Sequence, residues 1–152
     1  MKFTLLLILT FTVSFSSLAQ SEAIRKKHFN IKKKVAIKGY DPVSYFSGDP
    51  QEGSKSIWHT YKGVTYYFKD VSNQQKFKKD PAKYEPQYGG WCAYAIGETG
   101  DKVKINPERF QILDGKLYLF YDFGGFNTLE SWKKDQTNLK HKADKNWEKL
   151  VQ

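Results

Sequence analysis

Few residues of this chain could take part in chemistry. The 152 residues contain one cysteine, Cys92, and three histidines, His28, His59 and His141. Thiolate and imidazole groups are common ligands of copper and zinc, and a thiol beside a histidine is also the arrangement of a cysteine nucleophile. These residues do not stand at the short spacing of a metal-binding motif, so spacing alone does not single out a metal site.

The surroundings of Cys92 and His59 indicate what these two residues do. Cys92 lies between Trp91 and Ala93, an apolar setting in which a cysteine packs as a small hydrophobic residue. A catalytic Cys92 would need His59 or His141 as a base within hydrogen-bond reach. His59 lies in an alternating segment, where a histidine is more often packed and hydrogen-bonded than a ligand. We expect Cys92 to be buried. His59 is either a packed, hydrogen-bonded residue or a metal ligand, and both roles stay open.

Motifs for other chemistry are missing from the sequence. It contains no Gly-x-Ser-x-Gly nucleophile motif, no Gly-x-Gly-x-x-Gly dinucleotide motif and no phosphate-binding loop. The acidic residues are scattered, and only Asp41 stands in an apolar frame, so no carboxylate pair for acid–base catalysis can be assigned. A non-catalytic role is therefore favoured, with a thiol enzyme or redox sensor at Cys92 as the remaining enzymatic hypothesis.

The first 19 residues have the organisation of a secretory signal peptide. Lys2 is followed by an apolar run over residues 3–15 and by small residues that end at Ala19. The run is too short for a transmembrane helix, which needs about 20 apolar residues. We therefore expect an exported protein, periplasmic or secreted, that begins at residue 20 and does not span a membrane. With a single cysteine it holds no internal disulfide.

The net charge of +9 is concentrated near the N-terminus. Residues 20–38 hold seven basic residues and one acidic residue, whereas residues 39–152 hold 17 basic and 15 acidic residues. The sequence predicts a basic N-terminal arm over residues 20–34, favoured as a solvated leader. Alternatively, residues 25–34 bind a protein or an anionic surface. Nucleic acid is not an expected partner of an exported protein.

Local patterns predict the strands that position these residues. Alternation predicts a β-hairpin over residues 56–68, with His59 on one face and Trp58 on the other. Asp114-Gly115 predicts a second hairpin within residues 111–121. A short strand is expected at 35–37. Residues 89–97 are apolar and rich in small side chains, so we expect them either to be buried on both sides or to let two backbones approach closely.

Capping residues and apolar spacing predict the helices. Asp41 is the expected cap of a first helix that starts at Pro42, and Ser72 with Gln75 forms a capping box for a second helix that ends near Pro81. Thr128 is the expected cap of a third helix, which contains Leu129 and Trp132. A last helix is expected from the apolar stripe of Leu139, Ala143, Trp147 and Val151. Hairpins and helices without βαβ alternation predict a small single α+β domain over residues 35–150. In it, β-hairpins form an antiparallel sheet packed by short helices, with a C-terminal helix.

Five segments together resemble the YHS domain family in its exported, stand-alone form. They read KGYDPVSYF (38–46), WHTYKGVTYYF (58–68), FKKDPAKYEPQYGGWCAYA (77–95), DGKLYLFY (114–121) and ADKNW (143–147). The resemblance covers about residues 35–150. Trp58-His59-Thr60 takes the place of the Tyr-His-Ser motif that names the family.

The resemblance implies metal handling, because shorter YHS domains are associated with heavy-metal transport and resistance proteins that carry cysteines. Here Ser44 stands at the first of those cysteine positions, and residues 69–73 contain no cysteine. His59 is retained, and Cys92 lies in the Gly-Gly-aromatic-Cys-Ala segment. We therefore expect His59 and Cys92 to form a two-ligand site, suited to Cu(I) or to a site shared between two copies.

Two functions from different classes follow from these observations. The first is an exported accessory module that binds a transition metal such as copper at His59 and Cys92. The second is a non-catalytic interaction module that binds a protein, a glycan or an anionic surface through residues 25–34.

Overall fold

The computed structural model describes the backbone of residues 14–152 and the side chains of residues 21–152. The α-helices and strands are α1 (Ser14–His28), β1 (Ile31–Lys32), β2 (Val35–Ala36), β3 (Ser54–Tyr61), β4 (Val64–Phe68), α2 (Val71–Lys79), α3 (Pro81–Tyr84), α4 (Ala93–Glu98), β5 (Asn106–Leu113), β6 (Lys116–Phe120), β7 (Asp122–Phe123), β8 (Phe126–Asn127), α5 (Thr128–Lys134) and α6 (Gln136–Leu150). Short 3₁₀ turns are η1 (Ile37–Gly39), η2 (Ser44–Ser47) and η3 (Gln87–Gly90). Residues 1–13 of the expected signal peptide lie outside the described residues, and α1 continues across its expected end at Ala19.

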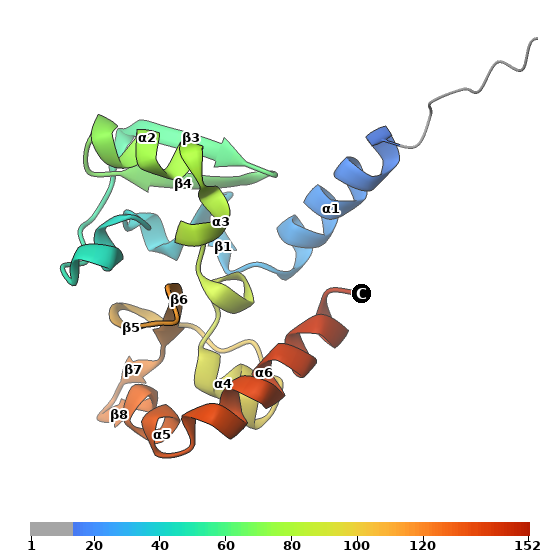
Figure 1. Cartoon of the computed structure of the whole chain (residues 1–152), viewed down its shortest axis with the longest axis vertical. Coiled ribbons are helices and arrows are strands. Elements are labelled where there is room, and N and C mark those ends of the chain that lie inside the picture. The colour runs from blue at the N-terminus through green and yellow to red at the C-terminus, as the bar shows by residue number, and fades with distance from the viewer. Residues whose placement is uncertain (1–13) are drawn as a thin grey trace, which may run out of the picture.

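The expected α+β class is confirmed. One sheet has the strand order β1-β2-β4-β3, and β5–β6 and β7–β8 form separate two-stranded ladders. Among the ladders between these strands, all are antiparallel except that of β2 with β4, which is parallel at Val35 and Thr65. Figure 1 shows the first sheet with α2 at one end of the molecule and α4, α5 and α6 at the other.

The four-stranded sheet buries one of its two faces. Val64, Tyr66 and Phe68 of β4 are fully buried, as the alternation of side chains along a strand requires. α2 covers this face with Phe77, whose ring centroid lies 4.8 Å from that of Tyr66 and 5.3 Å from that of Phe68. The opposite face is more open, because Trp58 on β3 remains 55% exposed.

The second half of the chain packs around α4 and α6. Ile96, Trp132 and Ala143 form part of a second buried cluster. A Cβ at Gly97 would lie 2.6 Å from the carbonyl oxygen of Leu139, so the two helix backbones touch where only glycine fits. Of the two alternatives expected for the small-residue segment, the close backbone approach is the one found at Gly97.

The basic arm packs against the body of the protein. Arg25 on α1 bonds Glu85 through both terminal guanidinium nitrogens, and each side chain is only 13% exposed. The Arg25 guanidinium also lies 4.3 Å from the ring centroid of Phe29, and Trp91 Nε1 donates to the carbonyl of His28 at 2.7 Å. Arg25 and the residues after it are therefore packed, whereas the sequence favoured a solvated leader. The count of charges could not predict this, because Glu85, the partner of Arg25, lies sixty residues away in the sequence.

Three predicted helix starts shift by small amounts. α2 is capped by Asp70, which accepts from the amide of Asn73, rather than by Ser72. α5 is capped by Asn127, one residue before the expected Thr128. The turn after Pro42 is the 3₁₀ turn η2. Among the described residues no helix is both long and apolar enough to cross a membrane.

Candidate functional site

His59 lies on the covered side of β3, as its alternation predicts. Its Cα pairs with that of Tyr66 on β4, and its ring centroid lies 6.3 Å from that of Phe77 on α2. Partial burial, and secondarily the charge of Lys78, lower the pKa of His59 below its ordinary value of 6.5. The imidazole is therefore neutral at pH 7, the state in which it packs against rings or ligates a metal.

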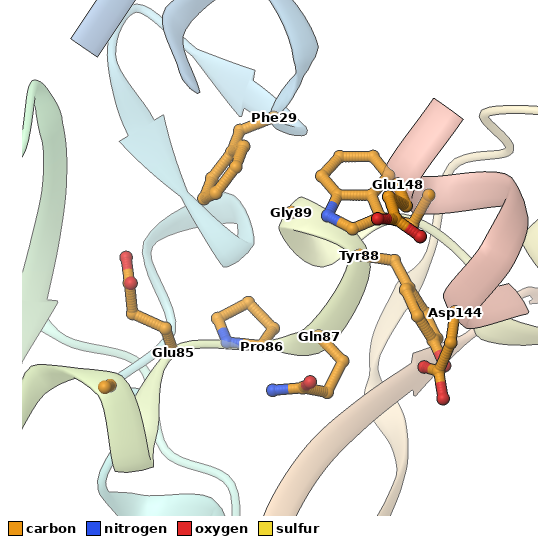
Figure 2. A pocket seen from close by; sticks show the side chains of 10 residues that line it. Phe29, Glu85, Pro86, Gln87, Tyr88, Gly89, Asp144 and Glu148 are labelled. Carbon is orange, nitrogen blue, oxygen red and sulfur yellow. The ribbon is translucent and has the colours of Figure 1, made fainter. Parts of the chain in front are cut away.

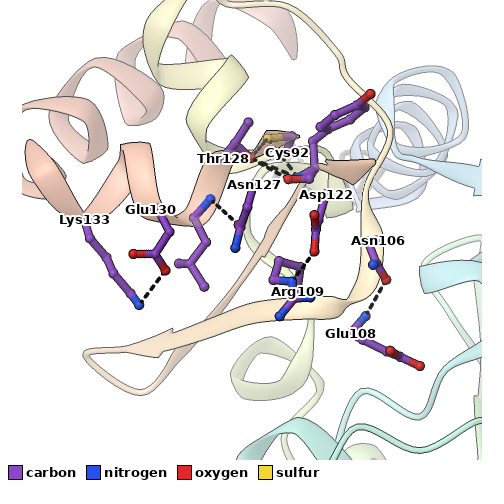
Figure 3. A network of polar contacts seen from close by, with 11 residues as sticks. Cys92, Asn106, Glu108, Arg109, Asp122, Asn127, Thr128, Glu130 and Lys133 are labelled. Carbon is purple, nitrogen blue, oxygen red and sulfur yellow. Dashed lines mark hydrogen bonds and ion pairs between the residues drawn. The ribbon is translucent and has the colours of Figure 1, made fainter. Parts of the chain in front are cut away.

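Cys92 is fully buried beside β6 and the start of α5. Its Sγ lies 3.3 Å from Thr128 Oγ1 and 3.4 Å from the amide nitrogen of Tyr121, and Figure 3 shows the contact with Thr128. Thr128 Oγ1 donates its own proton to the Tyr121 carbonyl at 3.0 Å, so the Cys92 thiol donates to Thr128. This hydrogen-bonded thiol ties the end of β6 to α5, and its burial agrees with the expectation from its apolar neighbours.

The two expected metal ligands lie in different parts of the fold. His59 belongs to β3 at one end of the molecule, and Cys92 precedes α4 and contacts α5 in the other half (Figure 1). Within the described part of the chain, no group of three or more His, Cys, Asp and Glu residues is placed to hold a metal ion. His28 pairs instead with Lys102, whose Nζ lies 3.0 Å from Nδ1, and His141 is exposed.

The open face of the four-stranded sheet carries a different set of side chains. Trp58 pairs with Tyr67 across β3 and β4, and Thr60 pairs with Thr65, their hydroxyls 3.0 Å apart. Val35 pairs with Thr65 and thereby extends this face onto β2. Paired residues point to the same side of a sheet, so aromatic, hydroxyl and aliphatic groups lie together on the open face.

A hollow of about 590 Å³ opens beside this face. Its lining comprises Lys32, Lys33, Val35, Lys38, Gly39, Lys55 and Tyr67, and we call it the lysine hollow. Among these described lining residues none is acidic, and the five ion pairs found between described side chains include none of the four lysines. The hollow therefore combines an apolar floor with uncompensated positive charge.

The backbone that presents these lysines adopts an uncommon conformation. Lys33 and Lys34 form the two-residue loop between β1 and β2 with φ values of 51° and 70°, and Lys38 has a φ of 54°. A hairpin loop with positive φ at both positions normally uses Asn-Gly, because a Cβ destabilises the left-handed conformation. Strain of this kind persists where surrounding structure imposes it and is concentrated at functional sites.

A fifth lysine, Lys104, lies near Lys38 outside the lining of the hollow. The ammonium groups of Lys38 and Lys104 lie 5.2 and 4.7 Å from the ring centroid of Phe123. Partial burial, and secondarily the charge of Lys104, lower the pKa of Lys38. An anion bound near Lys38 would relieve this repulsion.

The sequence located only part of this surface. Lys32 and Lys33 belong to the predicted basic arm, and Trp58 was correctly placed opposite His59. Lys38, Lys55 and Tyr67 were missed, because they join the hollow only through the pairing of β2 with β4. The one available signal was the group of lysines on either side of Val35.

Comparison with known proteins adds no family assignment. No protein-family model, curated protein or solved structure matches this chain. The resemblance to YHS domains stays a prediction based on the five sequence segments.

Proposed function

We propose that this protein is a non-catalytic, exported module that binds an anionic phospholipid surface with the open face of its four-stranded sheet. The observation that carries the proposal is the lysine hollow, in which four lysines surround an apolar floor without an acidic lining residue. Each lysine near an anionic bilayer contributes about 1 kcal/mol of attraction.

Trp58 favours a bilayer over other anionic partners. It is one of three large hydrophobic residues that remain more than half exposed among the described side chains, and its strand partner Tyr67 lines the hollow. Tryptophan and tyrosine are typical of membrane interfaces, where one end of the side chain is apolar and the other is wet. Lysine stems likewise cover apolar surface while their ammonium groups stay in water.

The test compares charge-matched variants on vesicles. Lys32→Gln with Lys55→Gln should lower the affinity for phosphatidylglycerol-containing vesicles about thirtyfold relative to the parent. The control removes the same charge from α6, with Lys142→Gln and Lys149→Gln, two exposed residues. Binding is measured by co-sedimentation, with digalactosyldiacylglycerol vesicles, which carry neither net charge nor choline, as the uncharged reference. An equal loss in both variants would show that only net charge matters and would contradict the proposal.

Tryptophan fluorescence tests the apolar contribution. Trp58→Ser should weaken vesicle binding and abolish the blue shift on binding, whereas Phe126→Ser, at another exposed residue, should leave both unchanged. Binding to a soluble sulfated polysaccharide in the absence of vesicle binding would replace the phospholipid with a glycan as the partner.

A further inference from the structure

A second hollow, of about 320 Å³, lies where three segments from distant parts of the chain meet. Its lining comprises Phe29, Ala82, Glu85, Pro86, Gln87, Tyr88, Gly89, Asp144, Trp147 and Glu148, and we call it the aromatic hollow. Figure 2 shows Phe29 facing the loop that carries Pro86 and Gln87, with Glu85 on one side and Glu148 on the other. Among these described lining residues none is basic, in contrast with the lysine hollow.

Three aromatic rings form the apolar wall of the aromatic hollow. The ring centroid of Trp147 lies 6.0 Å from that of Phe29 and 6.5 Å from that of Tyr88. Each ring presents a negative face, and a cation within about 6 Å of a ring centroid is attracted to it. The same wall already attracts a cation of this chain, because the Arg25 guanidinium lies 4.3 Å from the Phe29 centroid.

The backbone of the loop is shaped to bring these rings together. Tyr88 has a φ of 53° and is buried, and its hydroxyl donates to Asp144 Oδ1 at 2.8 Å. A Cβ at Gly89 would lie 2.8 Å from Phe29 and 2.9 Å from Trp147. The loop therefore needs glycine at position 89 to admit both rings.

The three carboxylates of the hollow differ in how far they are neutralised. Glu85 bonds Arg25 and accepts from Tyr66, and Asp144 bonds Lys140 at 2.7 Å. Glu148 is exposed and has no hydrogen-bond or ion-pair partner among the described side chains. The aromatic hollow thus keeps one uncompensated negative charge beside its rings.

We propose that the aromatic hollow binds a small organic cation of the quaternary ammonium class. Such a cation is weakly hydrated, makes no demand for several oxygen ligands and is recognised by aromatic rings with a nearby carboxylate. Hard inorganic cations fit poorly, because Ca²⁺ takes six to eight oxygen ligands and two of the three carboxylates here are already engaged. This site is independent of the phospholipid surface proposed for the open sheet face.

The test uses choline and its uncharged isostere 3,3-dimethyl-1-butanol with the full chain. Choline should bind at least about fivefold more tightly than the alcohol, because only the cation gains attraction from the rings and Glu148. Affinities are measured by isothermal titration calorimetry, and the bound position by NMR shifts of the Trp147 indole. Equal affinities for the two compounds would overturn the proposal.

Matched variants locate the binding. Glu148→Gln, an exposed substitution that leaves packing intact, should weaken choline binding about threefold without changing alcohol binding. Trp147→Leu should weaken it further. Glu130→Gln, an exposed control on α5, and the Lys32→Gln and Lys55→Gln variant should bind choline like the parent. Unchanged binding in both Glu148→Gln and Trp147→Leu would place the cation elsewhere and contradict the proposal.

Discussion

Arg25 shows how one side chain connects distant segments. It lies between Phe29 and Tyr61, with ring centroids 4.3 and 5.5 Å from the guanidinium carbon. It also bonds Glu85, which in turn accepts from the fully buried Tyr66. Burial, and secondarily the Glu85 charge, raise the pKa of Tyr66, so its hydroxyl remains a donor throughout the physiological pH range.

Removing Arg25 should leave Glu85 shielded from water without its counter-charge. We expect Arg25→Met to lower the free energy of unfolding by about 2–3 kcal/mol, because breaking a largely buried ion pair leaves the Glu85 carboxylate buried without a partner charge. Urea unfolding measures the change. Lys26→Met is the matched control, since Lys26 bonds Glu22 in an exposed pair, and should change stability by less than about 0.5 kcal/mol. Equal effects of the two substitutions would contradict the structural role of Arg25.

His59 should make stability depend on pH between about 5 and 7. Its folded-state pKa is lowered by partial burial and then by Lys78, so in this range the unfolded chain binds a proton that the folded protein resists. Stability is therefore full above the unfolded pKa of about 6.5 and falls as the pH decreases below it. We expect His59→Gln to reduce this loss between pH 7.5 and 5.5, measured by urea unfolding, and the exposed His141→Gln to leave it unchanged.

Metal binding by His59 and Cys92 stays a prediction. Titration of the apo-protein with Cu(I), Cu(II) and Zn(II), repeated with His59→Ala and Cys92→Ser, tests it directly. Loss of tight Cu(I) binding in both variants would support His59 and Cys92 as the ligands. Equal, weak binding in all three proteins would exclude it. Thiol reactivity of Cys92 only in denaturant would exclude the thiol-enzyme hypothesis as well.

At the scale of elements, the sequence predicted the turns whose conformation depends on adjacent residues. The Lys62-Gly63 and Asp114-Gly115 turns were located correctly because these residues have positive φ values that match the flanking strand twist. Caps were less accurate, because neighbouring acceptors compete for the same amide groups. Asp70 precedes Ser72 by two residues and caps α2 in its place.

Asp41 illustrates what a local pattern could not predict. Its carboxylate accepts from the amide of Val43 at 2.8 Å, as an Asp near a helix start does, but also from the Lys69 amide at 3.0 Å and Asn73 Nδ2 at 2.7 Å. These partners join the turn after Asp41 to the end of β4 and the start of α2. The parallel pairing of β2 with β4 is equally non-local, and the lysine hollow depends on it.

The β1–β2 loop offers a test of strain at the lysine hollow. Lys33→Asn with Lys34→Gly should raise the free energy of unfolding by about 1 kcal/mol, because both positions have positive φ. The same change should lower vesicle affinity by up to about thirtyfold, because it removes the Lys33 charge from the hollow and the adjacent Lys34 charge. Lys33→Gln alone should lower the affinity without stabilising the protein. A double variant that gains no stability would contradict the assignment of strain to this loop.

On the scale of the whole molecule, the two hollows have opposite charge. The lysine hollow gathers residues from β1, β2, β3, β4 and η1, whereas the aromatic hollow gathers residues from the loop after α1, from α3 and η3, and from α6. The net charge of +9 therefore does not reveal that a positively charged hollow and a negatively charged hollow are separated on the surface. The short segment from Phe29 to Lys33 contributes to both hollows, so the N-terminal arm belongs to both proposed binding surfaces as well as to the fold.

The arm's contribution to folding can be measured by truncation. A chain that starts at residue 35, the expected domain boundary, loses the Arg25–Glu85 pair, the Phe29–Trp147 contact and the Asn30 bonds to the η3 loop. We expect its melting temperature to fall by roughly 10 °C or more relative to a chain that starts at residue 20, because about 3 kcal/mol of contacts are lost. Circular dichroism on heating measures the shift.

Equal melting temperatures of the two chains would mean that the arm is a solvated leader after all. A large decrease has a consequence for binding experiments, because a truncated chain that fails to bind vesicles has lost both its lysines and part of its fold. Charge-only substitutions such as Lys32→Gln and Lys55→Gln avoid this ambiguity, since they leave the contacts of Arg25 and Phe29 in place. If vesicle affinity falls in these variants while the melting temperature stays constant, the open sheet face binds the anionic surface. This conclusion would not depend on the structural role of the arm.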